Sequence, residues 1–270
     1  MESIKELRVK LQTNQLGHPI LQRVLSIYLT RIVIPTNITA NQVSAAMLVV
    51  GLLASLSIFL GYIWLGFFLI YLSILLDAVD GEVARYRKTF SLQGIYLDLV
   101  NHLATQGLFF LALAFWVAEG ELGVMRSVVL ILGTIGAFAM SLRRANGDLH
   151  REIFVHHYSE HPEQFSLPQV PAKVVGSSTA NPASFIRALF GLVKKAIYQS
   201  EYLAIMVIVF FLTFLLELVF FPMASSHSLL KWLIIVYAAV SCLYLLREVI
   251  GGYYSIEGRV ALVKEKLASK

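Results

Sequence analysis

Six segments of about 20 mostly apolar residues constrain this chain more than any other feature. They span roughly 42–62, 64–83, 96–118, 124–145, 201–221 and 229–250. An α-helix needs about 20 apolar residues to cross a bilayer. Only 14% of the residues are charged, and the mean hydropathy is +0.72, whereas a soluble domain carries about 25% charged residues. We therefore predict an all-α, polytopic membrane protein with six transmembrane helices.

The boundaries of the first spans carry recognisable signals. Thr39 or Asn41 can cap the N-terminus of the first span, because both side chains accept hydrogen bonds from the free backbone N–H groups of a helix. Short turns at 61–64 and 119–123 join the first span to the second and the third to the fourth. We take residues 35–250, which contain all six spans, as one membrane domain.

The lysines and arginines are distributed very unevenly over the two ends of the predicted spans. Of the 22, only Arg126 and Lys231 fall on one side, and the remaining 20 fall on the side of the two chain ends. Cytoplasmic loops of membrane proteins carry an excess of Lys and Arg. We therefore predict that both termini and the active site are cytoplasmic. This orientation explains the formal net charge of +5 without nucleic-acid binding, for which no module is visible.

Three segments are expected to lie outside the bundle. Residues 1–34 form an N-terminal segment, in which 20–34 are predicted to be an interfacial amphipathic helix. The apolar side chains of that helix recur at helical spacing: Leu21, Val24, Leu25 and Tyr28. Residues 146–200 are predicted to form a long cytoplasmic loop within the membrane domain, and residues 251–270 a cytoplasmic tail.

The most informative polar residues lie in one window, 77–102. It covers the end of the second span and the start of the third. Ionisable groups at membrane depth are expensive and mark function by default. On a helix, one stripe would contain Asp77, Asp80, Gly81 and Ala84, at i, i+3, i+4 and i+7. A second stripe would contain Gly94, Asp98 and His102, at i, i+4 and i+8. If the second and third spans pair antiparallel, the two stripes can face each other.

Three converging carboxylates repel each other unless a cation neutralises them. Their hard oxygen ligands favour Mg²⁺, Mn²⁺ or Ca²⁺. Because Mg²⁺ is usually held by one or two carboxylates together with substrate phosphates, the window indicates a phosphate-bearing substrate. Gly81 and Ala84 leave the stripe without bulk, so that a substrate can lie against the backbone. Arg85 can offer a planar pair of donors to a phosphate.

Each of these residues, taken alone, is also compatible with a purely structural role. An intramembrane Asp can be a structural hydrogen-bonding group, and Gly81 or Ala84 can serve helix packing. Arg143 and Arg144, near the end of the fourth span, could hold an acceptor phosphate or a lipid headgroup, or act only as topology anchors. A divalent-cation transporter or channel that uses the Asp cluster is the alternative function. It predicts acidic groups spread over the membrane depth, whereas these cluster at one side beside an arginine.

The window resembles the signature of the CDP-alcohol phosphatidyltransferases, Asp-x2-Asp-Gly-x2-Ala-Arg-x8-Gly-x3-Asp-x3-Asp. Seven of its eight residues are identical here with the same spacing, and His102 replaces the last aspartate. The six spans and the lead-in Ile-Thr-Ala-Asn-Gln-Val-Ser at 38–44 are also similar to that family. The signature covers a small part of the chain, but it is highly specific.

The resemblance implies a function. Such enzymes transfer a substituted phosphoryl group from a CDP-linked donor to an alcohol acceptor and release CMP. At least one of the two substrates would be a lipid, as in phospholipid biosynthesis. The resemblance further implies a homodimer, although it does not name the donor or the acceptor.

The resemblance also implies roles for the residues of the window. The divalent metal, Mg²⁺ or Mn²⁺, would be held by Asp77, Asp80 and Asp98. The nucleotide and phosphate site would be lined by Gly81, Ala84, Arg85 and Gly94.

His102 is the one departure from this signature. In the family, the last aspartate is assigned both as a metal ligand and as the base that activates the alcohol. A neutral imidazole can take a proton, and its ordinary pKa of about 6.5 suits a base near neutral pH. We therefore predict His102 as a catalytic residue beside Asp98. A metal ligand or a substrate-orienting group is the alternative, and an inactive site is a third.

Overall fold

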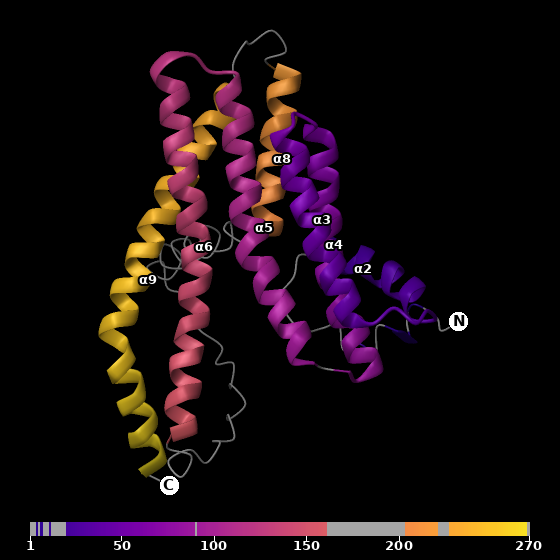
Figure 1. Cartoon of the computed structure of the whole chain (residues 1–270), viewed down its shortest axis with the longest axis vertical. Helices are drawn as coiled ribbons and strands as arrows, with labels where there is room; N and C mark the ends of the chain where they lie inside the picture. Colours follow the sequence, from indigo (N-terminus) through magenta and orange to yellow (C-terminus); the bar gives the residue numbers. More distant parts are fainter. Residues whose placement is uncertain are drawn as a thin grey trace, which may run out of the picture.

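The computed structural model describes residues 4, 6, 7, 11, 20–89, 91–160, 203–220 and 227–268. This part of the chain is helical and contains no strand (Figure 1). Its helices, in chain order, are α2 (Ile20–Val33), α3 (Ala40–Phe59), α4 (Ile63–Arg87), α5 (Leu92–Glu119), α6 (Gly123–Glu160), α8 (Leu203–Phe220) and α9 (Ser228–Ala268).

Six helices are long and apolar enough to cross a bilayer, which confirms the predicted fold class. They are α3, α4, α5, α8, the Gly123–Asn146 part of α6 and the Ser228–Tyr253 part of α9. Thr39, one of the two predicted caps, is the N-cap of α3 and forms a capping box with Gln42. At the motif the helices are longer than predicted, since α4 continues to Arg87 and α5 begins at Leu92.

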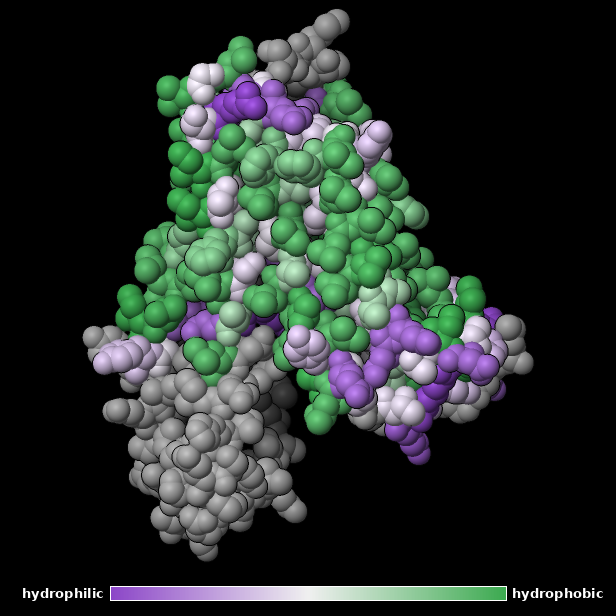
Figure 2. All heavy atoms as spheres, in the orientation of Figure 1, coloured by the Kyte–Doolittle hydropathy of each residue, from purple (hydrophilic) through white to green (hydrophobic). Residues whose placement is uncertain are grey.

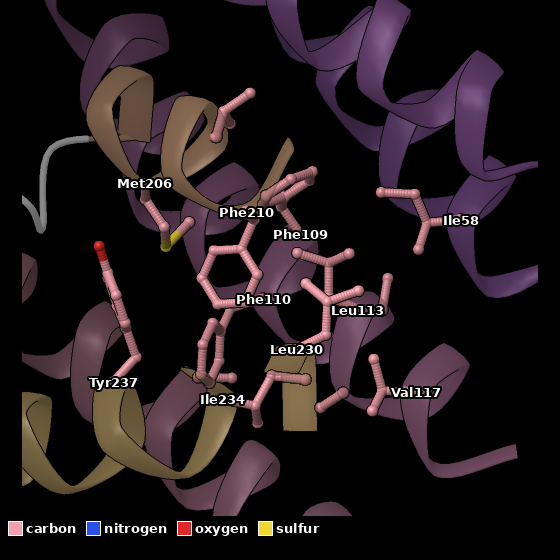
Figure 3. Close-up of a cluster of buried hydrophobic side chains, with 14 of the residues drawn as sticks. Ile58, Phe109, Phe110, Leu113, Val117, Met206, Phe210, Leu230, Ile234 and Tyr237 are labelled. Atoms are coloured by element: carbon pink, nitrogen blue, oxygen red, sulfur yellow. The ribbon is translucent and has the colours of Figure 1, made fainter. Parts of the chain in front are cut away.

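The largest hydrophobic cluster lies in the half of the bundle that is remote from the motif. It is built from α3, α4, α5, α6, α8 and α9, and Figure 3 shows its centre. Fully buried side chains there include Ile58, Phe109, Phe110, Phe210 and Leu230. Phe110 and Phe210 meet edge to face, with their ring centroids 5.9 Å apart. The largest apolar core therefore lies away from the motif.

The position of α3 differs from the simplest expectation, in which α4 and α5 pack directly on each other. α3 packs along both α4 and α5. Gly51 allows this approach: a Cβ on it would lie 2.7 Å from Thr105 of α5 and 3.1 Å from the Ser73 hydroxyl of α4. At the motif, α4 and α5 therefore meet through polar side chains.

The outer surface of the bundle is suited to lipid. Figure 2 shows a broad hydrophobic band between hydrophilic residues near the top and others lower down, on the side where Figure 1 places α2. Large exposed side chains of this surface include Phe68, Ile131, Phe138, Trp232 and Leu243. In water such a surface would be unfavourable, and a bilayer would cover it.

The prediction that a loop begins at 146 is wrong, because α6 continues as a helix to Glu160. At 1.5 Å per residue, its 38 residues extend over about 57 Å, well beyond the ~30 Å hydrocarbon core. α9 likewise continues to Ala268, through most of the predicted tail. The two helices pack along each other, and Figure 1 shows both extending past the rest of the bundle. The remaining predicted loop, 161–200, lies outside the described residues.

The predicted amphipathic helix is present as α2, beside the motif end of α4 (Figure 1). Its apolar residues Val24, Leu25 and Tyr28 are exposed, as an interfacial helix requires. Its opposite side is fully buried against the bundle and contains Ser26, Ile27 and Thr30. The buried side of α2 is therefore partly polar.

Buried polar contacts join α8 to the start of α9 at the end opposite the motif. Glu217, 6% exposed, accepts hydrogen bonds from the backbone N–H groups of Leu229 and Leu230, the latter at 3.0 Å. A carboxylate in this position caps the helix and interacts favourably with its dipole. Nearby, Lys231 Nζ donates to Glu121 Oε1 at 2.7 Å.

The cap of α9 gives a first prediction. Glu217→Ala should lower the free energy of unfolding by about 1–3 kcal/mol, because it leaves buried backbone N–H groups without their acceptor. Thermal unfolding of the detergent-solubilised protein measures this loss. Glu119→Ala removes an exposed carboxylate at the same end of the bundle and is the matched control. Equal melting temperatures for the two variants would contradict the capping role.

Candidate metal and active site

The motif folds as the last turns of α4 and the first turns of α5. Lys88, with φ of 54°, adopts the left-handed conformation that ends α4. Ser91 is the N-cap of α5, and its hydroxyl accepts a hydrogen bond from the Gly94 N–H at 3.0 Å. Both stripes are therefore helical, as the spacing predicts.

The structure brings together three of the predicted site residues. His102 Nε2 lies 3.2 Å from Asp98 Oδ1 and 3.6 Å from Asp77 Oδ1. One ligand atom from each of these residues lies within 4.8 Å of the others, and all three side chains are partly buried. α4 supplies Asp77, and α5 supplies Asp98 and His102 one turn apart. The two stripes therefore converge.

Asp80 lies close by but is held differently. Its Oδ2 accepts a hydrogen bond of 2.6 Å from the Ser44 hydroxyl of α3. Its charge interacts with those of Asp77 and Asp98, yet it does not join the group whose ligand atoms are within 4.8 Å of one another. In this arrangement Asp80 is oriented by α3, while Asp77 faces α5.

The chemistry of the cluster fits a divalent cation. Two carboxylates at this separation repel each other in a partly desolvated site, and a cation removes the repulsion. Carboxylate oxygens suit Mg²⁺ and Mn²⁺. An imidazole nitrogen in the same group is tolerated better by Mn²⁺ than by Mg²⁺, which strongly prefers oxygen ligands. Asp77, Asp98 and His102 would hold the ion, with further positions open to a substrate.

The remaining motif residues form three further contacts. Arg85 is exposed and folds back over Gly81, where a Cβ would lie 3.3 Å from its Nη1 atom. At Gly94, a Cβ would lie 2.8 Å from Asn41 Oδ1 of α3, so a side chain there would displace α5 from α3. Ala84 is partly buried and packs on an apolar cluster of α2, α3 and α4. Gly94 and Ala84 thus have packing contacts in the structure.

The two neighbouring arginines of α6 have different surroundings. Arg143 Nε lies 3.0 Å from Glu248 Oε1, and its guanidinium lies 5.0 Å from the centre of the Tyr244 ring. These contacts join α6 to α9. The charge of Arg144 instead acts on Asp98 and His102, and its Nε is buried with no hydrogen-bond partner among the described residues. Arg144 is therefore the arginine of this pair that faces the cluster.

Some site residues were not found from the sequence. Ser44 was visible only as the last residue of the lead-in to the first span. Asn41 was considered only as a cap, yet its side chain accepts a hydrogen bond of 2.7 Å from Ser91 and contacts Gly94. Both lie more than 30 residues from their partners in sequence, and no local pattern indicates such contacts.

Comparison with known proteins identifies the family. A family model described as CDP-alcohol phosphatidyltransferase matches residues 33–244, which is most of the chain and all six membrane-spanning helices in large part. No match was found among curated proteins. The extent of the family match agrees with the motif and with the six apolar helices, and the chain therefore belongs to the CDP-alcohol phosphatidyltransferase family.

Proposed function

We propose that this protein transfers a substituted phosphoryl group from a CDP-linked donor, such as CDP-diacylglycerol, to an alcohol acceptor and releases CMP. The observation that supports this most is the convergence of Asp77, Asp98 and His102 at the end of α4 and α5, in a chain of this phosphotransferase family. Family membership also favours the transferase over the cation transporter or channel.

In this reaction the acceptor oxygen forms a bond to the phosphorus that bears the substituent, and the bond from that phosphorus to the CMP oxygen breaks. The hydroxyl proton of the acceptor passes to a base, and CMP leaves as an anion. A divalent ion in the cluster would neutralise the pyrophosphate and stabilise the charge that develops on the leaving CMP. Positioning and electrostatic stabilisation would supply most of the catalysis.

The arginines near the cluster are suited to the charges of the donor and acceptor. Arg85 is exposed and lies over Gly81, where its guanidinium offers a planar pair of donors to a phosphate. Arg144 places a positive charge near Asp98 and His102. We assign Arg85 to the donor phosphates and Arg144 to an anionic group of the acceptor or of a lipid headgroup. Gly81 and Arg85 would line the nucleotide site together with Ala84 and Gly94.

His102 is best assigned as a metal ligand. Its Nε2 faces both Asp77 and Asp98, which is the arrangement of a shared cation site. The sequence favours His102 as a base, and that assignment remains the alternative. We then assign Asp98, which lies beside His102, as the base that takes the proton of the acceptor hydroxyl.

The distribution of basic residues bears on which side of the membrane the site faces. Arg126 and Lys231 lie in the first turns of α6 and α9, at the end opposite the motif. The excess of basic residues at the motif end supports a cytoplasmic active site and cytoplasmic termini. At least one substrate would be a lipid that reaches the site from the bilayer, as in phospholipid biosynthesis. A homodimer is expected from the family resemblance.

The proposal is tested with the purified full-length protein in detergent. CMP release should be observed when CDP-diacylglycerol is supplied with a panel of alcohols and phosphorylated alcohols, and mass spectrometry should identify the lipid product. Activity should vanish in excess EDTA and return with Mg²⁺ or Mn²⁺. Asp98→Asn is the inactive control. Full turnover in EDTA, or metal uptake into liposomes without CMP release, would contradict the proposed function.

The geometry of the cluster predicts an order of importance among the aspartates. Asp77→Asn and Asp98→Asn should each weaken Mn²⁺ binding by at least about tenfold, because each removes a charged ligand. Asp80→Asn should weaken it less, since that carboxylate is held by Ser44 outside the cluster. Mn²⁺ titration followed by electron paramagnetic resonance (EPR) measures binding without turnover. An Asp80 effect larger than that of Asp77 would argue against this geometry.

The metal dependence of the His102→Ala variant distinguishes the ligand role of His102 from the base role. If His102 is a metal ligand, His102→Ala should raise the Mn²⁺ concentration for half-maximal rate by at least about tenfold, and high Mn²⁺ should restore the rate. His102→Asp should recover activity and shift the preference towards Mg²⁺, because it returns an oxygen ligand. As a base, His102→Ala would instead reduce the rate by about 10²–10⁴-fold at saturating metal. Failure of high Mn²⁺ to restore the rate would refute the ligand assignment.

A further inference from the structure

Glu82 is a buried carboxylate that the reaction does not use. It lies within the motif, next to Gly81, and is 2% exposed. Its neighbours in the chain on the same side of α4, Val79 and Val83, are fully buried and apolar. Burying a carboxylate is unfavourable unless its oxygens are hydrogen-bonded.

Both oxygens of Glu82 accept hydrogen bonds from hydroxyl groups of α2. Ser26 Oγ donates to Oε1 at 2.8 Å, and Thr30 Oγ1 donates to Oε2. Ser26 and Thr30 are themselves completely buried and lie one turn apart on the buried side of α2. This contact explains why the buried side of a helix with exposed apolar residues is polar.

The same helix is bonded to α4 at a second point. The guanidinium of Arg87 donates to the backbone carbonyl of Val33, the last residue of α2, at 3.4 Å. It also donates to carbonyls of the linker to α3, those of Ile34 at 3.1 Å, Thr36 at 2.7 Å and Ile38 at 2.6 Å. The end of α2 is therefore fixed on α4 at two positions, Glu82 and Arg87, about a turn and a half apart.

Glu82 and Asp80 lie on opposite faces of α4. Residues two apart on an α-helix differ in direction by about 200°. Asp80 is bonded to Ser44 of α3 on one face, and Glu82 is bonded to α2 on the other. Contacts on opposite faces resist rotation of the helix about its axis. Asp77, which faces Asp98 and His102, lies one turn before Asp80 on this same segment.

We propose that Glu82 is a positioning residue for the metal site. By bonding α4 to Ser26 and Thr30 of α2, it fixes the rotation of α4 at which Asp77 faces Asp98 and His102. Metal ligands must be held within about 0.5 Å of their working geometry, so a small rotation of α4 is sufficient to disturb the site. α2 is then a structural part of the site. This inference rests on the metal site proposed above.

The test measures Mn²⁺ binding to the full-length protein by EPR, together with thermal unfolding. Glu82→Ala should weaken Mn²⁺ binding by about tenfold, the lower end of the range for residues that orient ligands. Glu82→Gln should stay within about twofold of wild type, because an amide still pairs with both hydroxyls. Thr30→Val, which is nearly isosteric, should weaken binding in the same direction. It should add nothing to Glu82→Ala, since the two residues act through one contact.

Glu217→Ala is the matched control. It removes another buried glutamate that bonds a neighbouring helix, at the opposite end of the bundle, so it should lower the melting temperature and leave Mn²⁺ binding unchanged.

Several results would overturn the inference. One is a Glu82→Ala variant that loses stability as Glu217→Ala does yet binds Mn²⁺ as wild type does. Another is equal loss of binding in Glu82→Gln and Glu82→Ala, which would assign the effect to charge. If Glu82→Ala does not fold, Thr30→Val decides: unchanged Mn²⁺ binding overturns the inference and weakened binding supports it. A wild-type protein that binds no Mn²⁺ would overturn the metal site itself.

Discussion

The mutual repulsion of carboxylates at the end of a membrane bundle is the constraint on which this structure depends. Asp77 and Asp98 come from different helices and meet, with His102, in a partly buried place. Such a group is unfavourable without a compensating charge, and His102 and then Arg144 supply part of it at Asp98. In the proposed function, a divalent cation supplies the remaining positive charge. The same repulsion between Asp77 and Asp98 would favour a divalent cation, and the bound cation would in turn attract the phosphates of a substrate.

The largest apolar core and the proposed site lie in different halves of the bundle. The large apolar cluster around Phe109, Phe110 and Phe210 fills the half of the bundle away from the motif. The motif half contains a smaller apolar cluster of α2, α3 and α4 and is held in addition by specific polar contacts, Ser44 with Asp80 and α2 with Glu82. The hydrophobic effect is non-directional, whereas hydrogen bonds depend on direction and so constrain the rotation of a helix. A site that needs defined ligand positions is therefore supported by the second kind of contact.

Much of the fold could be predicted from the sequence because membrane spans depend on local composition. The six spans, the capping residue Thr39 and the helical stripes of the motif all follow from spacing within a few residues. The continuation of α6 to Glu160 could not be predicted in this way, since a polar helix beyond the membrane has the composition of a loop. The partners of Asp80 and Glu82 lie in segments distant in the sequence, and those of Glu217 lie in the next helix, so no local pattern indicates them. The insertion of α3 between α4 and α5 depends on Gly51, one of many small residues in the spans.

The central claim is that one divalent ion is shared by α4 and α5 through Asp77, Asp98 and His102. The most direct measurement is pulsed EPR of Mn²⁺ bound to the purified protein, which detects nitrogen nuclei that coordinate the metal. The account predicts a histidine nitrogen coupling in the wild-type protein that disappears in His102→Asp while Mn²⁺ remains bound. Bound Mn²⁺ without a histidine coupling in the wild-type protein, or with a coupling that persists in His102→Asp, would contradict it.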